Sequence, residues 1–148
     1  MRRFDYDGPS SGGGGGGGGV GQIISAGRPG NRTVGDYLRA AGNAPLTAAR
    51  GVAVFASGTI SSVYWVGVVA GGTPGDPIGL EISVIRAGSV VSSTIVDCTT
   101  ALSATSFVLP AALAVLAADS ITVSLASASA GTATGASNII VSMEVVAS

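Results

Sequence analysis

The chain has 148 residues, of which 47% are hydrophobic and only 10% are charged, against about 25% charged residues in an average soluble domain. It contains no histidine, one cysteine, and no basic residue other than its seven arginines. Histidine-dependent catalysis, lysine Schiff-base chemistry and cysteine–histidine metal centres are therefore excluded. We expect a protein that is not an enzyme and that holds no cofactor or metal. A chain this poor in charge is also expected to bury part of its surface against other chains.

Charge and glycine are divided unevenly along the chain. Residues 1–50 hold six arginines and three aspartates, whereas residues 51–148 hold one arginine and five acidic residues. The first part also contains eight consecutive glycines, at residues 12–19. Because glycine loses more backbone freedom on ordering than any other residue, this run is not expected to fold on its own. We interpret residues 1–35 as an extended, glycine-rich anchoring arm.

The arm carries six side chains suited to binding a partner: Arg2, Arg3, Phe4, Tyr6, Arg28 and Arg32. Arginine binds the phosphates of a nucleic acid as well as the carboxylates of an acidic protein surface. The two aromatic residues favour the protein partner, because they add buried area that phosphate binding does not need. We therefore predict contact with another protein and expect no nucleic-acid binding. Pulled straight, the segment from Gly8 to Gly21 would span roughly 48 Å, enough to cross a neighbouring subunit.

A short helix and a turn are expected at residues 36–47, between the arm and the main domain. Asp36 is a typical N-cap, good helix formers follow it, and Gly42 would end the helix. Asn43 and Pro45 are typical turn residues.

From residue 48 onward the pattern is one of strands and turns. Alternating apolar and polar residues predict strands at 51–55, 59–69, 80–85, 90–96, 107–109, 121–125 and 139–146. The strands at 80–85 and 90–96 are joined by turn residues and form an expected hairpin. Seven or eight strands in about 100 residues are typical of an antiparallel sandwich such as a jelly roll. We therefore predict an all-β sandwich at residues 48–148.

Several outward-facing positions of these strands are apolar, where an ordinary sandwich would be charged. Ile85, Ile140 and Val146 fall on the face expected to be polar. Tyr64 and Trp65 are adjacent in one strand, so one faces the core and the other faces outward, as an interface anchor or a sugar platform. We predict that these five residues form an oligomer interface or pack in the core. A cyclic homo-oligomer would cover such a face.

The remaining motifs favour structural roles. The glycine run contains G-x-G-x-x-G but lacks the preceding strand and following helix of a phosphate-binding loop. Asp5 and Asp7 are a poor start for a calcium site, which needs about six to eight oxygens. Cys98 is expected to be a buried thiol. Three other aspartates fit caps or turns: Asp36, Asp76 and Asp97. A hydrolase would require a pair of carboxylates in one cleft, and no such pair clusters along the chain.

No signal sequence or membrane span is expected. The two arginines near the start precede no apolar stretch, and the apolar run at 107–118 is short and contains Pro110, whereas a span takes about 20 residues. We expect the protein to be made in a cytoplasm.

Residues 116–125, Leu-Ala-Ala-Asp-Ser-Ile-Thr-Val-Ser-Leu, and the strand at 139–146 resemble the C-terminal hairpin of trimeric jelly-roll proteins. These occur in phage head fibres, capsid decoration proteins and tail-fibre tips, and in the complement C1q and tumour necrosis factor group. A Leu-x-x-Gly-Asp pattern often precedes this strand in those families, and Ala118 replaces the glycine here. The glycine-rich leader before a charge-poor β domain also resembles bacteriophage virion proteins. The resemblance implies a homotrimer with a structural role in a virion.

Two functions remain open. The leading hypothesis is a structural virion protein, a capsid decoration, cement or head-fibre protein, assembled in the host cytoplasm and attached through its arm to a capsid or other virion protein. The alternative is a receptor-binding tail-fibre or adhesin tip that recognises host glycan through the loops at 71–77 or 130–137. Many copies per particle would favour the first, and few would favour the second.

Overall fold

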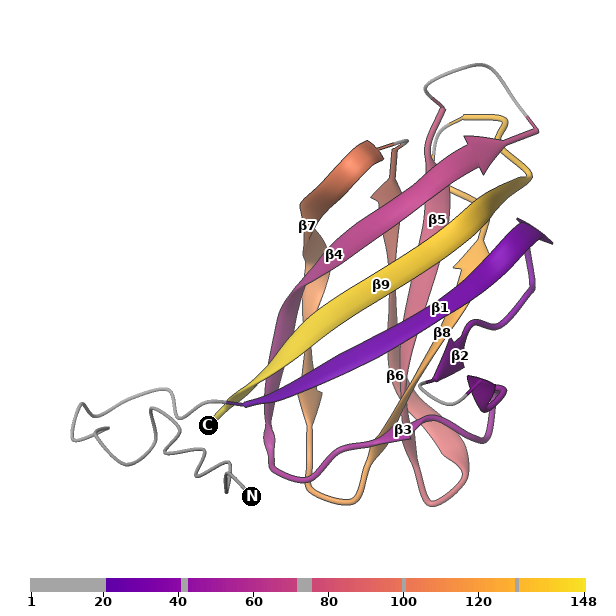
Figure 1. Cartoon of the computed structure of the whole chain (residues 1–148). Coiled ribbons are helices and arrows are strands. Elements are labelled where there is room, and N and C mark those ends of the chain that lie inside the picture. The colour runs from indigo at the N-terminus through magenta and orange to yellow at the C-terminus, as the bar shows by residue number, and fades with distance from the viewer. Residues whose placement is uncertain (1–20, 41–42, 72–75, 100, 130) are drawn as a thin grey trace, which may run out of the picture.

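The computed structural model describes residues 21–40, 43–71, 76–99, 101–129 and 131–148, and its named elements are all strands (Figure 1). They are β1 (Gln22–Thr33), β2 (Arg39–Ala40), β3 (Val52–Ala53), β4 (Gly58–Ala70), β5 (Ile78–Arg86), β6 (Ser89–Cys98), β7 (Ala101–Val115), β8 (Ser120–Ala126) and β9 (Gly135–Ala147). Sheet A has the strand order β2-β1-β9-β4-β7, and sheet B has the order β3-β8-β5-β6. All paired strands are antiparallel. The predicted all-β, antiparallel sandwich is confirmed.

The strands follow the alternation read from the sequence. In β9, Met143 and Val145 are buried whereas Glu144 and Val146 are exposed, because successive side chains of a strand point to opposite faces. The expected hairpin is formed by β5 and β6, which pair from Ile78 and Cys98 to the turn beyond Arg86. The two turn residues, Ala87 and Gly88, have φ of 52° and 80°, as a two-residue hairpin turn requires.

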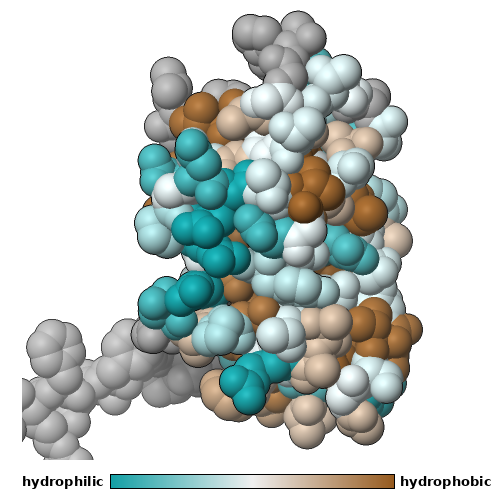
Figure 2. Space-filling view, turned by 90° about the vertical axis from the view of Figure 1, so that its right-hand side faces the viewer, coloured by the Kyte–Doolittle hydropathy of each residue, from teal (hydrophilic) through white to brown (hydrophobic). Residues whose placement is uncertain are grey.

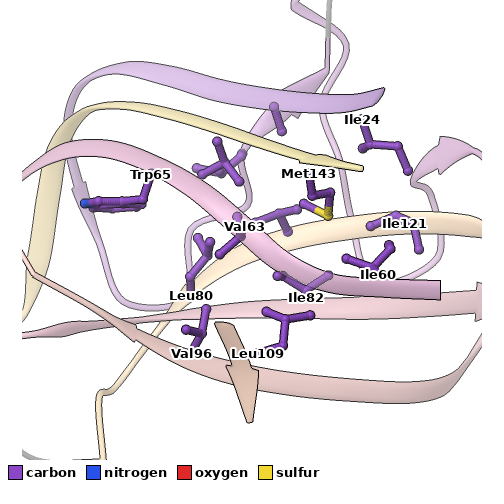
Figure 3. Close-up of a cluster of buried hydrophobic side chains, with 14 of the residues drawn as sticks. Ile24, Ile60, Val63, Trp65, Leu80, Ile82, Val96, Leu109, Ile121 and Met143 are labelled. Atoms are coloured by element: carbon purple, nitrogen blue, oxygen red, sulfur yellow. The ribbon is translucent and has the colours of Figure 1, made fainter. Parts of the chain in front are cut away.

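The core lies between the two sheets and consists mainly of apolar side chains. Side chains from both sheets interdigitate in it (Figure 3), among them Ile24, Ile60, Val63, Trp65, Leu80, Ile82, Val96, Leu109, Ile121 and Met143. Burial of these side chains is the main favourable contribution to folding. No helix long and apolar enough to cross a membrane occurs in the described ranges.

The helix predicted for residues 36–42 is wrong for residues 36–40, the part that the structure describes. This segment runs in extended conformation along β8: the Leu38 amide donates to the Val123 carbonyl at 2.9 Å, and the Leu125 amide donates to the Asp36 carbonyl at 2.9 Å. The Asp36 carboxylate accepts a hydrogen bond from the Thr33 amide at 3.0 Å and closes a turn instead of capping a helix. A helix of one or two turns is marginal in water, and burying Leu38 in the core outweighs it.

The sandwich also begins earlier than residue 48. Residues 22–33, which the glycine content assigned to the arm, form β1, and β1 pairs with β9 from Gln22↔Val145 to Thr33↔Gly135. Ile24 and Ala26 of this strand are buried in the core. Residues 1–20, with the glycine run, lie outside the described residues.

Gly67 lies directly against the indole of Trp65. A Cβ at this position would lie 2.6 Å from Trp65 Cζ2, and Trp65 is fully buried. We expect Gly67→Ala to lower the free energy of unfolding by about 1–2 kcal/mol through overpacking, measured by urea denaturation followed by Trp65 fluorescence. Ser61→Ala, at an exposed position of the same strand, is the control and should change little. An unchanged midpoint for Gly67→Ala would contradict this packing.

Candidate interaction surface

The outer face of sheet A exposes an unusual amount of apolar surface. Among the side chains that the structure describes, six large hydrophobic ones point out from it: Ile23, Tyr64, Val68, Val108, Ile140 and Val146. Val108 is 78% exposed and Ile140 is 60% exposed, so neither is covered by its own chain. Large exposed apolar patches mark interaction sites in soluble proteins. We call these six residues the apolar face.

Strand register arranges the apolar face in rows across the sheet. One row places hydroxyl groups side by side, from Ser25, Ser142, Tyr64 and Ser106. The next row is apolar and consists of Gly27, Ile140 and Val66. The Ser25 and Ser142 hydroxyl oxygens are 3.3 Å apart. Two charged residues flank the rows, Glu144 opposite Ile23 and Arg39 opposite Gly27. The two rows therefore consist of uncharged side chains, several of them small.

The structure divides the five predicted interface or packing residues. Tyr64, Ile140 and Val146 are exposed on the apolar face, while Trp65 and Ile85 are buried at 0% and 3% exposure. Trp65 and Ile85 therefore pack inside the chain and are not available to a partner. The alternation expected for Tyr64 and Trp65 places the tyrosine outward and the tryptophan in the core.

Of the six predicted partner-contact residues, four lie outside the described residues: Arg2, Arg3, Phe4 and Tyr6. Arg28 and Arg32 belong to β1 and not to a free arm. Arg28 Nη1 donates to the Tyr37 carbonyl at 2.8 Å, and Arg32 Nε and Nη2 donate to the Pro29 carbonyl at 3.1 and 2.9 Å. Their guanidinium groups brace the backbone at one edge of the sandwich.

That edge contains a shallow hollow that the sequence did not reveal. A depression of about 300 Å³ lies between Ile140, Gly27 and Arg39, and a second of about 310 Å³ adjoins it beside Arg28. Gly27 opens the floor because it has no side chain. Figure 2 looks onto the side of the sandwich that carries this edge, where hydrophilic side chains gather in a band. We call this feature the basic hollow.

A larger groove lies between the edge strands β6 and β7. It has a volume of about 560 Å³ and is lined mainly by apolar side chains together with one acid: Ile95, Asp97, Phe107, Val108 and Pro110. The Asp97 carboxylate accepts hydrogen bonds from the Ser129 amide and hydroxyl, which fixes it at the rim. We call this feature the acidic groove.

The ionisable groups of the described residues include a buried thiol and a carboxylate in an ion pair. No group of three or more His, Cys, Asp or Glu side chains there could hold a metal ion. Cys98 is buried, and burial together with the charge of Asp97 raises the pKa of its thiol to about 12. Asp119 is bound by Arg86 through two contacts of 2.8 Å. Each of these groups serves the fold.

The chain matches no protein-family model, and no curated protein matches it.

Proposed function

We propose that the protein is a structural virion component, a capsid decoration or head-fibre protein, that works as a homo-oligomer attached to another virion protein through residues 1–20. The observation that carries the proposal is the apolar face, because a monomeric soluble protein rarely leaves such a surface open. Covering it with sister copies removes apolar area from water without desolvating charges. The small side chains between its members allow close approach of a second surface.

The strand order supports the jelly-roll resemblance on which the trimer is based. Apart from the two-residue β2, the strands divide into β1-β9-β4-β7 and β3-β8-β5-β6, which suits the eight strands in two sheets of a jelly roll. Ala118, at the position of glycine in the Leu-x-x-Gly-Asp pattern, has a φ of 74°. This is the left-handed conformation that glycine adopts most readily. We therefore propose three copies per assembly.

The position of β1 favours attachment through the preceding residues. Gln22, at the start of β1, pairs with Val145 near the end of β9, so β1 begins at the end of the sandwich where the C-terminus lies (Figure 1). In a cyclic assembly all arms leave from the same end. Several weak arm contacts then act together, and the assembly binds more tightly than one arm does.

Deletion of residues 2–20 tests the attachment. Because β1 begins at Gln22, we expect the truncated chain to keep its fold and its oligomeric mass but to lose binding to particles, measured by co-sedimentation. A full-length variant with residues 12–19 replaced by alternating glycine and serine is the control and should still bind. Particle binding by the truncated chain would contradict attachment through residues 1–20.

Contacts between two loops favour the alternative, a receptor-binding fibre tip. The Asp76 carboxylate accepts hydrogen bonds from the Thr132 amide at 2.9 Å and from its hydroxyl at 2.6 Å, and the Thr134 amide donates to the Gly71 carbonyl at 2.7 Å. The two loops expected to recognise glycan are thus joined at one end of the sandwich. Binding of the protein to host-cell glycans, with few copies per particle, would favour this function over decoration.

A further inference from the structure

We infer that copies of this chain associate head to tail, with the basic hollow of one copy docked on the acidic groove of the next. The inference rests on the proposed homo-oligomer and names the two surfaces that meet in it. The two surfaces lie on opposite sides of the molecule: β2 and β7 are the two ends of sheet A, and β6 is the end of sheet B next to β7 (Figure 1).

The basic hollow presents apolar surface between two positive charges. Ile140 projects beside it with 60% of its surface exposed, and Arg28 and Arg39 border it on either side. Within the described ranges, these guanidinium groups donate to the backbone carbonyls of Tyr37 and Asn43 and to no carboxylate. Each arginine has further donors for an acceptor from outside, since a guanidinium carries five N–H groups.

The acidic groove presents the opposite combination. Val108 is 78% exposed and Ile95 is 44% exposed, and both line the groove with Phe107. Asp97 supplies a negative charge at its rim and is held in place by Ser129. An apolar side chain the size of Ile140 therefore finds apolar walls here, with an acid available to the arginines beside it.

A second copy of this chain matches both surfaces at once. Because the two surfaces are different patches of one molecule, the contact is heterologous, and heterologous contacts close into rings when the rotation between copies permits. Val108 and Ile140 both belong to the apolar face, so joining the two edges continues that face from copy to copy. A ring that turns the face inward covers the remaining apolar residues.

Two single variants and their mixture test the direction of the contact. Ile140→Glu places a carboxylate in the hollow, opposite Asp97 of the next copy, and Val108→Arg places a guanidinium in the groove, opposite Arg39. Each variant alone is expected to have the monomer mass of 14.2 kDa in sedimentation equilibrium. Mixed in equal amounts, they should form a species of at least twice that mass, because the first keeps its groove and the second keeps its hollow.

The controls are Phe55→Glu and Phe55→Arg, which make the same changes at a residue that is 79% exposed outside both surfaces. They should keep the wild-type mass, and buried-tryptophan fluorescence should show that all variants fold. Self-association of either single variant, or a mixture that stays monomeric, overturns the head-to-tail contact. If the wild type forms an oligomer but the mixture stays monomeric, the head-to-tail contact is wrong and the proposed homo-oligomer is not contradicted. A wild-type protein with the monomer mass would contradict the proposed homo-oligomer itself.

Discussion

Replacing Trp65 with alanine is expected to lower the free energy of unfolding by about 3–5 kcal/mol, the usual cost of truncating a large buried aromatic side chain. Trp65 is fully buried in the core and is the one tryptophan of the chain. Because a domain has only about 5–15 kcal/mol of stability in total, this variant should unfold at a much lower urea concentration. Circular dichroism measures the effect, since the substitution removes the fluorescent residue.

Trp65→Phe separates the volume of the side chain from its polar group. The indole Nε1 is buried and has no hydrogen-bond partner in the described part of the chain, and a buried donor without a partner is unfavourable by about 1–3 kcal/mol. Phenylalanine removes that donor while leaving a smaller cavity than alanine. We expect its loss of stability to be within about 1 kcal/mol of zero for this reason. Equal destabilisation by phenylalanine and alanine would contradict the interpretation that the buried Nε1 group has no hydrogen-bond partner.

The sequence predicts those strands that bury one face and expose the other. Alternation in β9 and the turn between β5 and β6 are local patterns, and both were readable. Strand β1 was not, because its partner β9 lies more than a hundred residues away along the chain and its glycine and arginine content matches an arm. The segment after Asp36 has good local helix propensity, but backbone pairing with β8 and burial of Leu38 decide its conformation.

The candidate surface was predictable to the same extent. Alternation placed Ile140 and Val146 outward, as the structure has them, but it did not decide which of Tyr64 and Trp65 faces out. It also placed Ile85 outward, whereas Ile85 is buried. The basic hollow joins Ile140 to Arg39, and the acidic groove joins Ile95 to Val108. The members of each pair belong to different strands, and for the groove to different sheets. Such features depend on how sheets end and meet, which no periodicity in a single sequence encodes.

Asp119 makes the stability of the sandwich dependent on acid. Its carboxylate is 2% exposed and accepts hydrogen bonds at 2.8 Å from Arg86 Nε, Arg86 Nη2 and the Leu116 amide. The hydrogen bonds from Arg86, with that from Leu116, hold the pKa of Asp119 below its ordinary value of 3.8. A carboxyl whose folded-state pKa is lowered stabilises the fold fully above its unfolded pKa, and that contribution is lost as the pH falls through the folded-state pKa. Stability should therefore decline below about pH 4.

Asp119→Ala is expected to lower the free energy of unfolding by about 2–3 kcal/mol at neutral pH, because charge-assisted hydrogen bonds are among the stronger ones. Asp119→Asn keeps the shape but not the charge, and should fall between alanine and the wild type. Urea denaturation at a series of pH values measures all three. The stability of both variants should decline less with falling pH than that of the wild type, because they lack the Asp119 carboxylate. Their curves of unfolding free energy against pH should therefore approach the wild-type curve at low pH. Parallel curves would mean that another carboxyl causes the decline, and that the link between Arg86 of β5 and Asp119 in the turn before β8 contributes little to it.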